Sequence, residues 1–250
     1  MATYALSVLV PLILFGCGPN TYSVKTPAAD IAIGECVVLL HGLGRTYHSM
    51  DKMQEALIQA GYHTVNLDYP SRKKDIKSIA AEEIPIALEQ CRRFNPDAVH
   101  FVTHSLGGIV TRMAIKQSRP EKLGRVVMLS PPNRGSRVVD HLKERWYYLW
   151  FNGPAGQQLS TAKNSIPNQL GPVDYSVGII TGDRQAFFDK WLSSYIKGPN
   201  DGKVSVEHAK VDGMTDFIVV HESHPFIMNS KNVQRKTVHF LKYGTFTHQD

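Results

Sequence analysis

Short apolar runs alternate with longer segments of helical period along most of the chain. Six runs are rich in Val, Ile and Leu, and they cover residues 36–40, 64–67, 99–102, 126–129, 177–180 and 217–220. Several of these runs are apolar at consecutive positions, which is typical of parallel strands buried on both faces of a sheet. We therefore predict six strands in the core of the protein.

The segments between the first strands have one apolar face each. Residues 49–60 and 75–91 repeat apolar side chains at helical spacing, which predicts two amphipathic helices. Strands that alternate with helices of this length predict the α/β class, with right-handed crossovers, a mostly parallel sheet and helices on both faces. We assign residues 31–250 to one domain of this kind.

Residues 133–175 interrupt the alternation, because they contain no convincing strand pattern. We predict a small helical insertion there. Five aromatic residues fall within six positions of this segment, namely Trp146, Tyr147, Tyr148, Trp150 and Phe151. They could pack on the sheet edge as ordinary core, or form a cap that lines an acyl pocket or meets lipid. The sequence leaves both interpretations open.

The first 16 residues predict an export signal. They carry no charged side chain, and their apolar run is shorter than the ~20 residues that a membrane-spanning helix needs. Residues 14–17, Leu-Phe-Gly-Cys, resemble a bacterial lipobox, in which Cys17 becomes the lipidated first residue of the mature protein. No Lys or Arg precedes the apolar run, which leaves an uncleaved or ordinary secretory signal open.

We interpret residues 17–30 as a linker and expect a lipid-anchored protein of the cell envelope. Gly18 stands where Asp would resemble an inner-membrane retention signal, so an outer-membrane protein facing the periplasm is favoured. If Cys17 is lipidated, Cys36 and Cys91 remain, and they could pair or stay as buried thiols.

The charge pattern limits the classes of partner. The chain has 28 Lys and Arg against 22 Asp and Glu, a net charge of +6, which allows a weak attraction to anionic lipid. The basic residues are spread out, and we expect the largest cluster, residues 72–74, to be a solvated loop. We predict no nucleic-acid partner, and the absence of HExxH, EF-hand or CxxC spacing predicts no metal and no cofactor.

Ser105 is the strongest candidate for a nucleophile. It lies in residues 103–108, Thr-His-Ser-Leu-Gly-Gly, between the strand predicted at 99–102 and a helical pattern. A serine followed by small residues at this junction fits a tight turn that exposes the hydroxyl above the sheet. The start of the helix also offers N–H groups to a developing oxyanion. A turn that serves only packing is the alternative.

Residues 41–44, His-Gly-Leu-Gly, directly follow the first predicted strand. Their glycines allow the backbone to approach a substrate closely. We predict that the backbone N–H groups of Leu43 and Leu106 form an oxyanion hole. His41 precedes the nucleophile in the chain and is expected to be structural.

The segments HGLGRT at 41–46 and THSLGG at 103–108 resemble those of the α/β-hydrolase superfamily. The resemblance is to its bacterial serine esterases and lipases, including the compact group related to GPI-inositol-deacylase-like hydrolases, and extends from about Cys36 to the C-terminus. Thr103 replaces the first Gly of the usual G-x-S-x-G, as small residues do in some lipases. The resemblance implies the chain order nucleophile, acid, base.

That order implies an acid after the strand at 177–180 and a histidine after the last strand. Asp183 and Asp201 compete as the acid, and we favour Asp201 because its segment is similar to the N-D-G-x-V-S segment of related lipases. His224 is favoured over His221 as the base, since S-H-x-F-I-M resembles the corresponding segment of similar esterases.

The resemblance implies a serine hydrolase that cleaves small-molecule or lipid esters through an acyl-enzyme. Acyl transfer or amide cleavage by the same residues is one alternative. A non-catalytic envelope binding protein on the same scaffold is another, because a fold does not determine function. The joint presence of Ser105, Asp201 and His224 argues against that last interpretation.

Overall fold

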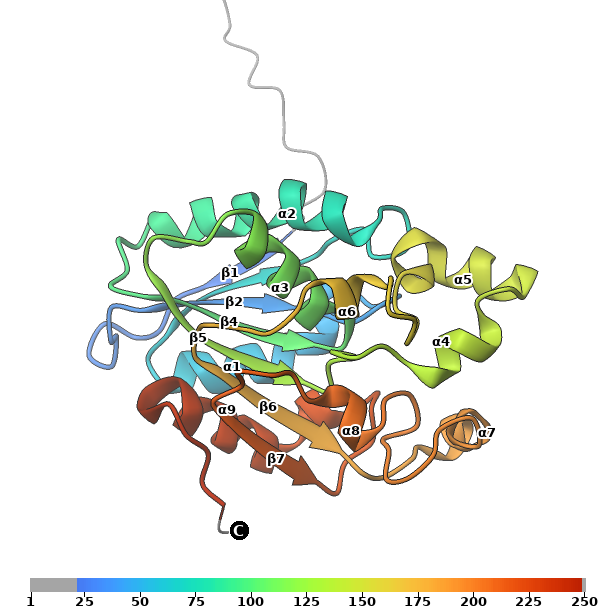
Figure 1. Ribbon diagram of the computed structural model, residues 1–250. Coiled ribbons are helices and arrows are strands. Elements are labelled where there is room, and N and C mark those ends of the chain that lie inside the picture. The colour runs from blue at the N-terminus through green and yellow to red at the C-terminus, as the bar shows by residue number, and fades with distance from the viewer. Residues whose placement is uncertain (1–21, 249–250) are drawn as a thin grey trace, which may run out of the picture.

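A computed structural model of the protein describes residues 22–248, and its centre is one seven-stranded sheet (Figure 1). The strand order is β1-β3-β2-β4-β5-β6-β7. Only β1 is antiparallel to its neighbour, and every other pair is parallel. The strands are β1 (Tyr22–Lys25), β2 (Cys36–Leu40), β3 (His63–Leu67), β4 (Val99–His104), β5 (Leu123–Leu129), β6 (Val177–Gly182) and β7 (Asp216–Val220).

Helices cover both faces of the sheet, as the sequence predicts. In Figure 1, α2 and α3 lie above the sheet and α1 and α9 lie below it. The described helices are α1 (Asp51–Gln59), α2 (Ile76–Arg92), α3 (Leu106–Gln117), α4 (Arg137–Leu142), α5 (Trp146–Gln157), α6 (Ile166–Gln169), α7 (Lys190–Ser193), α8 (Val206–Ala209) and α9 (Lys231–Tyr243). Three short 3₁₀ helices are η1 (Tyr47–Met50), η2 (Phe187–Asp189) and η3 (Ile227–Asn229). The predicted α/β fold is confirmed.

Alternation along β2 divides the core into two layers. Val38 and Leu40 belong to the cluster that packs under α2 and α3, whereas Val37 and Leu39 belong to the cluster on the side of α1 and α9. All five residues of β2 are buried, which is why the run 36–40 reads as continuously apolar. The residue before α2 explains where this helix begins. Asp75 caps the helix, because its side chain accepts a hydrogen bond from the N–H of Ser78 at 3.0 Å.

The predicted linker at 17–30 is wrong over residues 22–25, which form β1. This edge strand pairs with β3, from Tyr22 opposite Leu67 to Lys25 opposite Thr64. It is held by backbone hydrogen bonds and is partly exposed, so only two of its four residues are apolar and its periodicity is too short to detect. Cys17 and the predicted signal at 1–16 lie outside the described residues.

Cys36 and Cys91 form a disulfide that ties the first residue of β2 to the last turns of α2. Both residues are fully buried. The sequence left their pairing open, because a buried thiol and a buried disulfide look alike in composition.

Residues 133–175 contain α4, α5 and α6 and no strand, as predicted. Helix α5 is kinked at Gly153, whose φ is +60°. A Cβ at this position would overlap the backbone oxygen of Arg72. The loop that follows β3 therefore lies directly against α5, although the two segments are far apart in the sequence.

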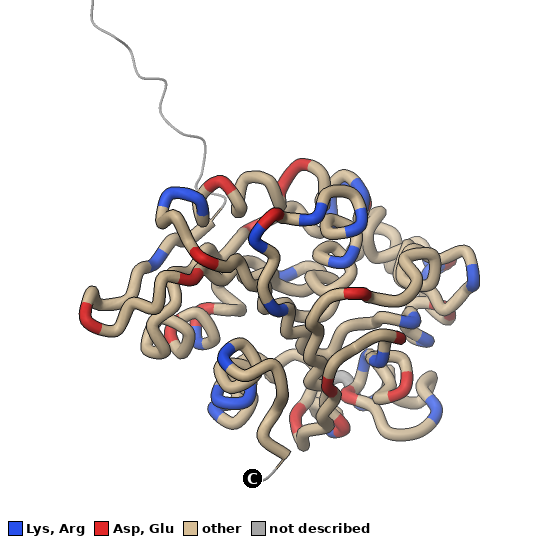
Figure 2. The backbone as a smooth tube through the Cα atoms, turned by 60° about the vertical axis from the view of Figure 1, so that its left-hand side comes forward, with Lys and Arg blue, Asp and Glu red and all other residues tan. Residues whose placement is uncertain are grey.

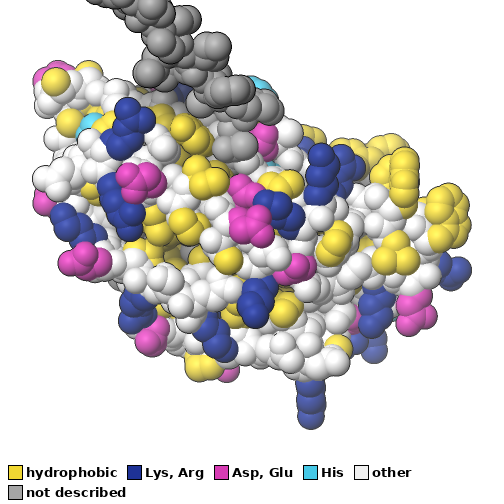
Figure 3. Space-filling model, turned by 90° about the horizontal axis from the view of Figure 1, so that it is seen from above, with side chains coloured by type: hydrophobic (Ala, Val, Ile, Leu, Met, Phe, Trp, Pro, Cys, Tyr) yellow, Lys and Arg dark blue, Asp and Glu magenta, His cyan; other side chains and the backbone are white. Residues whose placement is uncertain are grey.

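The surface mixes the two signs of charge. Lys and Arg are interspersed with Asp and Glu along the backbone (Figure 2). Seen from above, exposed hydrophobic side chains gather at the end of the molecule where α5 lies in Figure 1 (Figure 3). Within residues 22–248 no helix is both long and apolar enough to cross a membrane.

Candidate active site

Ser105 occupies the turn between β4 and α3. Its φ of +53° and ψ of −119° lie where residues with a side chain are rarely found. The turn is enforced by close packing, since a Cβ at Gly107 would lie 2.8 Å from the backbone oxygen of Leu40. The N–H of Ser105 donates to the oxygen of Leu129 at 2.9 Å. Strained backbone of this kind occurs where surrounding structure holds a functional side chain in place.

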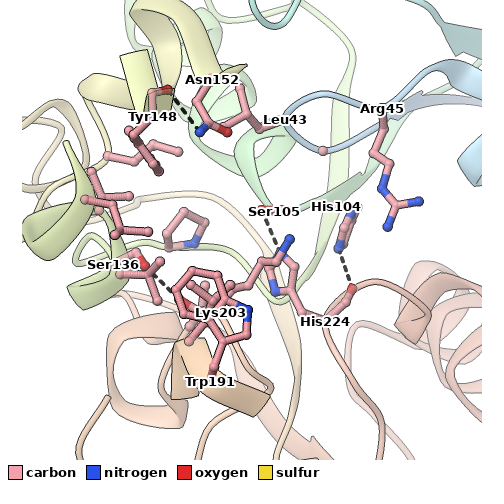
Figure 4. Close-up of a pocket in the computed structure, with 18 residues that line it drawn as sticks. Leu43, Arg45, His104, Ser105, Ser136, Tyr148, Asn152, Trp191, Lys203 and His224 are labelled. Atoms are coloured by element: carbon pink, nitrogen blue, oxygen red, sulfur yellow. Dashed lines mark hydrogen bonds between the residues drawn. The ribbon is translucent and has the colours of Figure 1, made fainter. Parts of the chain in front are cut away.

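Three side chains from separate loops form one hydrogen-bonded chain. His224 Nε2 lies 3.0 Å from Ser105 Oγ, and His224 Nδ1 lies 2.8 Å from Asp201 Oδ2. A carboxylate only accepts hydrogen bonds, so Nδ1 carries the hydrogen and Nε2 is free to accept the hydroxyl proton. Figure 4 shows Ser105 and His224 facing each other inside the pocket. The structure thus brings together Ser105, Asp201 and His224, which the sequence singled out.

Asp201 is fully buried and has hydrogen-bond partners on both oxygens. Its Oδ1 accepts from the N–H groups of Lys203 and Val204 at 3.0 and 2.8 Å, while Oδ2 faces His224. Burial alone would raise the pKa of this carboxyl, but the nearby His224 and these hydrogen bonds hold the pKa below its usual value. Asp201 is therefore a carboxylate at neutral pH, able to orient the His224 ring.

The competing acid and base, Asp183 and His221, do not line the cavity of Ser105. Asp183 Oδ1 is 2.9 Å from His221 Nδ1, and the His221 side chain is 76% exposed. The two residues thus pair with each other at the surface. Although Asp183 follows β6 directly, as a family acid would, the structure places Asp201 next to the histidine that faces Ser105.

His41 directly follows β2. It is fully buried, its ring stacks on Tyr69 with centroids 4.1 Å apart, and its Nε2 lies 3.2 Å from Asp68 Oδ1. These contacts hold the loop after β2, in keeping with the structural role expected for His41.

Two backbone N–H groups near Ser105 have no hydrogen-bond partner among residues 22–248. They belong to Leu43, in the loop after β2, and to Leu106, the first residue of α3. Leu43 and Ser105 line the same pocket, and Leu106 adjoins Ser105 in the chain. Unpaired donors at a helix start are suited to bind an oxyanion.

A cavity of about 230 Å³ lies beside Ser105. The insertion at 133–175 supplies much of its wall, and most of the side chains that it contributes are apolar: Val138, Val139, Leu142, Tyr148 and Leu159. Tyr148 is the aromatic residue of α5 that turns inward. An apolar cavity with a few convergent polar groups is typical of a small-molecule site.

A second wall comes from residues 183–215, between β6 and β7, where the sequence pointed to Asp183 and Asp201 but to no cavity wall. This segment contains η2, α7 and α8, and Trp191, Leu192, Lys203 and Val204 line the cavity. Phe187, Phe188 and Trp191 fall within five positions. The same kind of aromatic cluster marks the first insertion, so the sequence also carries a signal for this second wall.

Among residues 22–248 no group of three or more His, Cys, Asp and Glu side chains is arranged to hold a metal ion. The carboxylates and imidazoles near the cavity are instead engaged with one another or with backbone groups.

The sequence model of the alpha/beta hydrolase family matches residues 37–211. The chain belongs to this family. The match includes the Ser105 turn, the loop of Leu43 and the loop of Asp201. No curated protein sequence matches the chain.

Solved structures with this α/β-hydrolase fold include lipases. The mature form of the Bacillus licheniformis lipase BlEst2 has a TM-score of 0.73 at 19% identity, covering 92% of this chain and all of that one. Phospholipase PlaB from Legionella pneumophila has a TM-score of 0.62 at 16% identity, covering 85% and 57%. The monoacylglycerol lipase of Paleococcus ferrophilus has a TM-score of 0.57 at 16% identity, covering 89% and 98%.

These similarities show that the chain shares its fold with lipases. The narrower resemblance to GPI-inositol-deacylase-like hydrolases stays a prediction. At identities below 20%, the substrates of these proteins do not transfer to this one.

Proposed function

We propose that the protein is a serine hydrolase of carboxylic esters, with Ser105 as nucleophile, His224 as base and Asp201 as acid. The observation that carries the proposal is the unbroken chain of two hydrogen bonds from Ser105 through His224 to Asp201, at 3.0 and 2.8 Å. Such a chain is what a serine needs to attack a carbonyl at neutral pH.

In the first half-reaction, Ser105 Oγ bonds to the ester carbonyl carbon while its proton passes to His224 Nε2. Asp201 stabilises the resulting imidazolium without taking its proton. The N–H groups of Leu43 and Leu106 hold the negative oxygen of the tetrahedral intermediate. The carbon–oxygen bond to the alcohol then breaks, His224 returns its proton to the leaving oxygen, and an acyl group remains on Ser105.

In the second half-reaction, water replaces the alcohol. His224 Nε2 takes a proton from the water as its oxygen attacks the acyl carbon. The bond to Ser105 Oγ breaks, and the proton on His224 returns to that oxygen. A carboxylic acid leaves and the enzyme is restored.

The apolar wall favours an acyl chain as the part of the substrate that enters the cavity. The lining side chains Val138, Leu142 and Leu159 offer no hydrogen bonds, and they are buried. Small esters and lipid esters both have such a chain.

The test is labelling of the full chain with a fluorophosphonate, together with hydrolysis of p-nitrophenyl esters of rising chain length. We expect the wild type to be labelled and to hydrolyse the esters. Ser105→Ala should lose both the labelling and the ester hydrolysis. A folded wild type that neither labels nor hydrolyses any ester would reject the proposal in favour of the non-catalytic binding protein. Transfer of the acyl group to an added alcohol in preference to water would reject hydrolysis in favour of acyl transfer.

We also propose that the protein is exported and anchored through Cys17. The lipobox-like segment motivates this proposal, and the Cys36–Cys91 disulfide supports an oxidising compartment. Labelled palmitate fed to expressing bacteria should enter the wild type and not Cys17→Ser. Equal labelling of both would exclude the anchor.

A further inference from the structure

Large apolar side chains are exposed on two segments at one end of the molecule. One segment is the first half of α5, and the other runs from η2 into α7. Trp146, Trp150 and Phe187 are 77%, 74% and 94% exposed. We call the whole set the aromatic rim, and it consists of Trp146, Leu149, Trp150, Phe151, Phe187, Phe188 and Trp191.

This exposure is unusual for these residue types. Tryptophan and phenylalanine are normally among the more buried side chains, and clustered exposure of this kind marks an interaction surface. Tyr148 is the buried aromatic residue in the first half of α5. Its neighbours on both sides point to solvent, so the outer face of α5 lacks a partner among the described residues.

The two segments of the aromatic rim flank the cavity of Ser105. Tyr148 and Asn152 of α5 line one side of this cavity, and Trp191 and Leu192 of α7 line the other. In Figure 1 both helices lie at the same end of the molecule, beyond the carboxyl ends of the strands. Phe188 of the rim also packs edge-on against Phe226, two residues after His224, with ring centroids 6.1 Å apart.

Positive charge accompanies the aromatic rim. Arg145 precedes α5 and Lys190 begins α7, while Arg72 lies against the kink of α5 at Gly153, with Lys73 beside it. All four residues are exposed. None of them forms an ion pair with a described residue, so their charges are available to an anionic partner.

We propose that the aromatic rim docks the protein on the surface of an anionic phospholipid bilayer. Trp and Phe side chains insert among the headgroups and upper acyl chains, and the flanking cations meet lipid phosphates. In this orientation the cavity of Ser105 faces the lipid. Docking does not depend on hydrolysis, but delivery of lipid esters to Ser105 rests on the proposed function.

The chain offers a local probe of this docking. It has three tryptophans, Trp146, Trp150 and Trp191, and all belong to the aromatic rim. Residues 1–21 contain none, so an N-terminal anchor that inserted by itself would leave the tryptophan signal unchanged. Tryptophan emission therefore reports on the aromatic rim alone.

The experiment uses the full chain carrying Ser105→Ala, which prevents hydrolysis, with vesicles of phosphatidylglycerol or of phosphatidylcholine. We expect tryptophan emission to shift to shorter wavelength and to be quenched by brominated acyl chains. Both effects should require a much lower lipid concentration with phosphatidylglycerol than with phosphatidylcholine. Emission that neither shifts nor is quenched with anionic vesicles would overturn the proposal. A lipid-free dimer that shields the tryptophans from a soluble quencher would also overturn it, because a second copy would then cover the rim.

Paired variants test the apolar side chains and the flanking cations separately. Leu149→Ser with Phe187→Ser should weaken vesicle binding about tenfold or more, whereas Tyr243→Ser, an exposed aromatic of α9, should not. Arg72→Glu with Lys73→Glu should weaken binding to anionic vesicles about tenfold or more. The matched control is Arg92→Glu with Arg93→Glu, at the far end of α2. Equal loss in variants and controls would overturn the proposal.

Activity separates the two proposals. Leu149 and Phe187 do not line the cavity, so in the chain with Ser105 their variants should hydrolyse a soluble short-chain ester as the wild type does and lose activity on vesicle lipid. A wild type that docks and hydrolyses nothing would reject the proposed hydrolase and leave the docking surface standing. Unchanged activity of the rim variants on vesicle lipid would reject the docking surface.

Discussion

His104 Nε2 lies 2.9 Å from the backbone oxygen of His224, so the residue before Ser105 touches the residue that faces Ser105 (Figure 4). A carbonyl only accepts, and Nε2 of His104 therefore donates. The other ring nitrogen of His104 is buried without a hydrogen-bond partner among the described residues. Burial, with His224 and Arg45 nearby, holds the pKa of His104 well below its usual value. A neutral His104 thus positions the loop that carries His224.

We expect His104→Ala to lower kcat by about 10- to 100-fold with little change in KM, because a small displacement of a catalytic group is enough for such a loss. His104→Gln should recover much of the activity, since its amide can still donate to the carbonyl. Ester hydrolysis and thermal unfolding of both variants are the measurements. Equal loss of kcat in both variants would contradict the positioning role, as would a loss that follows stability alone.

The choice of acid is open to a direct comparison. Asp201→Asn should lower kcat by about 10⁴-fold, because the amide no longer holds His224 in the required tautomer. Asp183→Asn is the matched control, and it should leave kcat nearly unchanged, since Asp183 contacts His221 at the surface. The reverse result would assign the acid to Asp183.

Acid should destabilise the fold from about pH 6.5 downward. Burial lowers the pKa of His100, His104 and His208 in the folded state, so the unfolded chain binds more protons as pH falls through the ordinary value near 6.5. Each such group removes up to about 1.4 kcal/mol of unfolding free energy per pH unit. The lowered pKa of Asp201 adds a further loss below about pH 4, its unfolded value.

Urea unfolding at pH 7.5, 6.0 and 5.0 measures this dependence. His208→Gln, which lies outside the cavity lining, should reduce the slope between pH 6.0 and 5.0. A free energy of unfolding that stays constant or rises on acidification would refute the assignment of these histidines as neutral.

Reduction of the Cys36–Cys91 disulfide should destabilise the protein by about 4 kcal/mol on the chain-entropy account, because the closed loop is long; the two cysteines are 55 residues apart. Dithiothreitol should lower the urea midpoint of the wild type and have no effect on the double variant Cys36→Ala, Cys91→Ala. That variant retains Cys17, which controls for other thiol effects. An unchanged wild-type midpoint would contradict the expected contribution.

Local burial made much of the fold predictable. Residues 36–40 are apolar throughout because both faces of β2 are covered, and the predicted strand coincides with the observed one. The Ser105 turn was also visible, since the small residues at 107 and 108 reflect the close approach of β2 and Pro131.

Other features depend on contacts that periodicity does not record. The edge strand β1 buries little and therefore carries almost no pattern. Asp183 and Asp201 both follow β6, and only the path of the 183–215 segment decides which one reaches His224. The contact of His104 with His224 joins residues 120 positions apart, and the approach of Arg72 to Gly153 is likewise set by topology.

The fit of Gly153 against Arg72 determines how this chain could be recombined with a relative. A donor segment that replaced residues 133–175 alone would have to carry glycine at the matching position, because any side chain there meets the Arg72 backbone. Exchange of residues 68–74 together with 133–175 would transfer both halves of the fit. Residues 133–175, which supply the apolar wall of the cavity, and the loop at 68–74 therefore form one exchangeable unit, while the loops holding Ser105, Asp201 and His224 stay with the recipient.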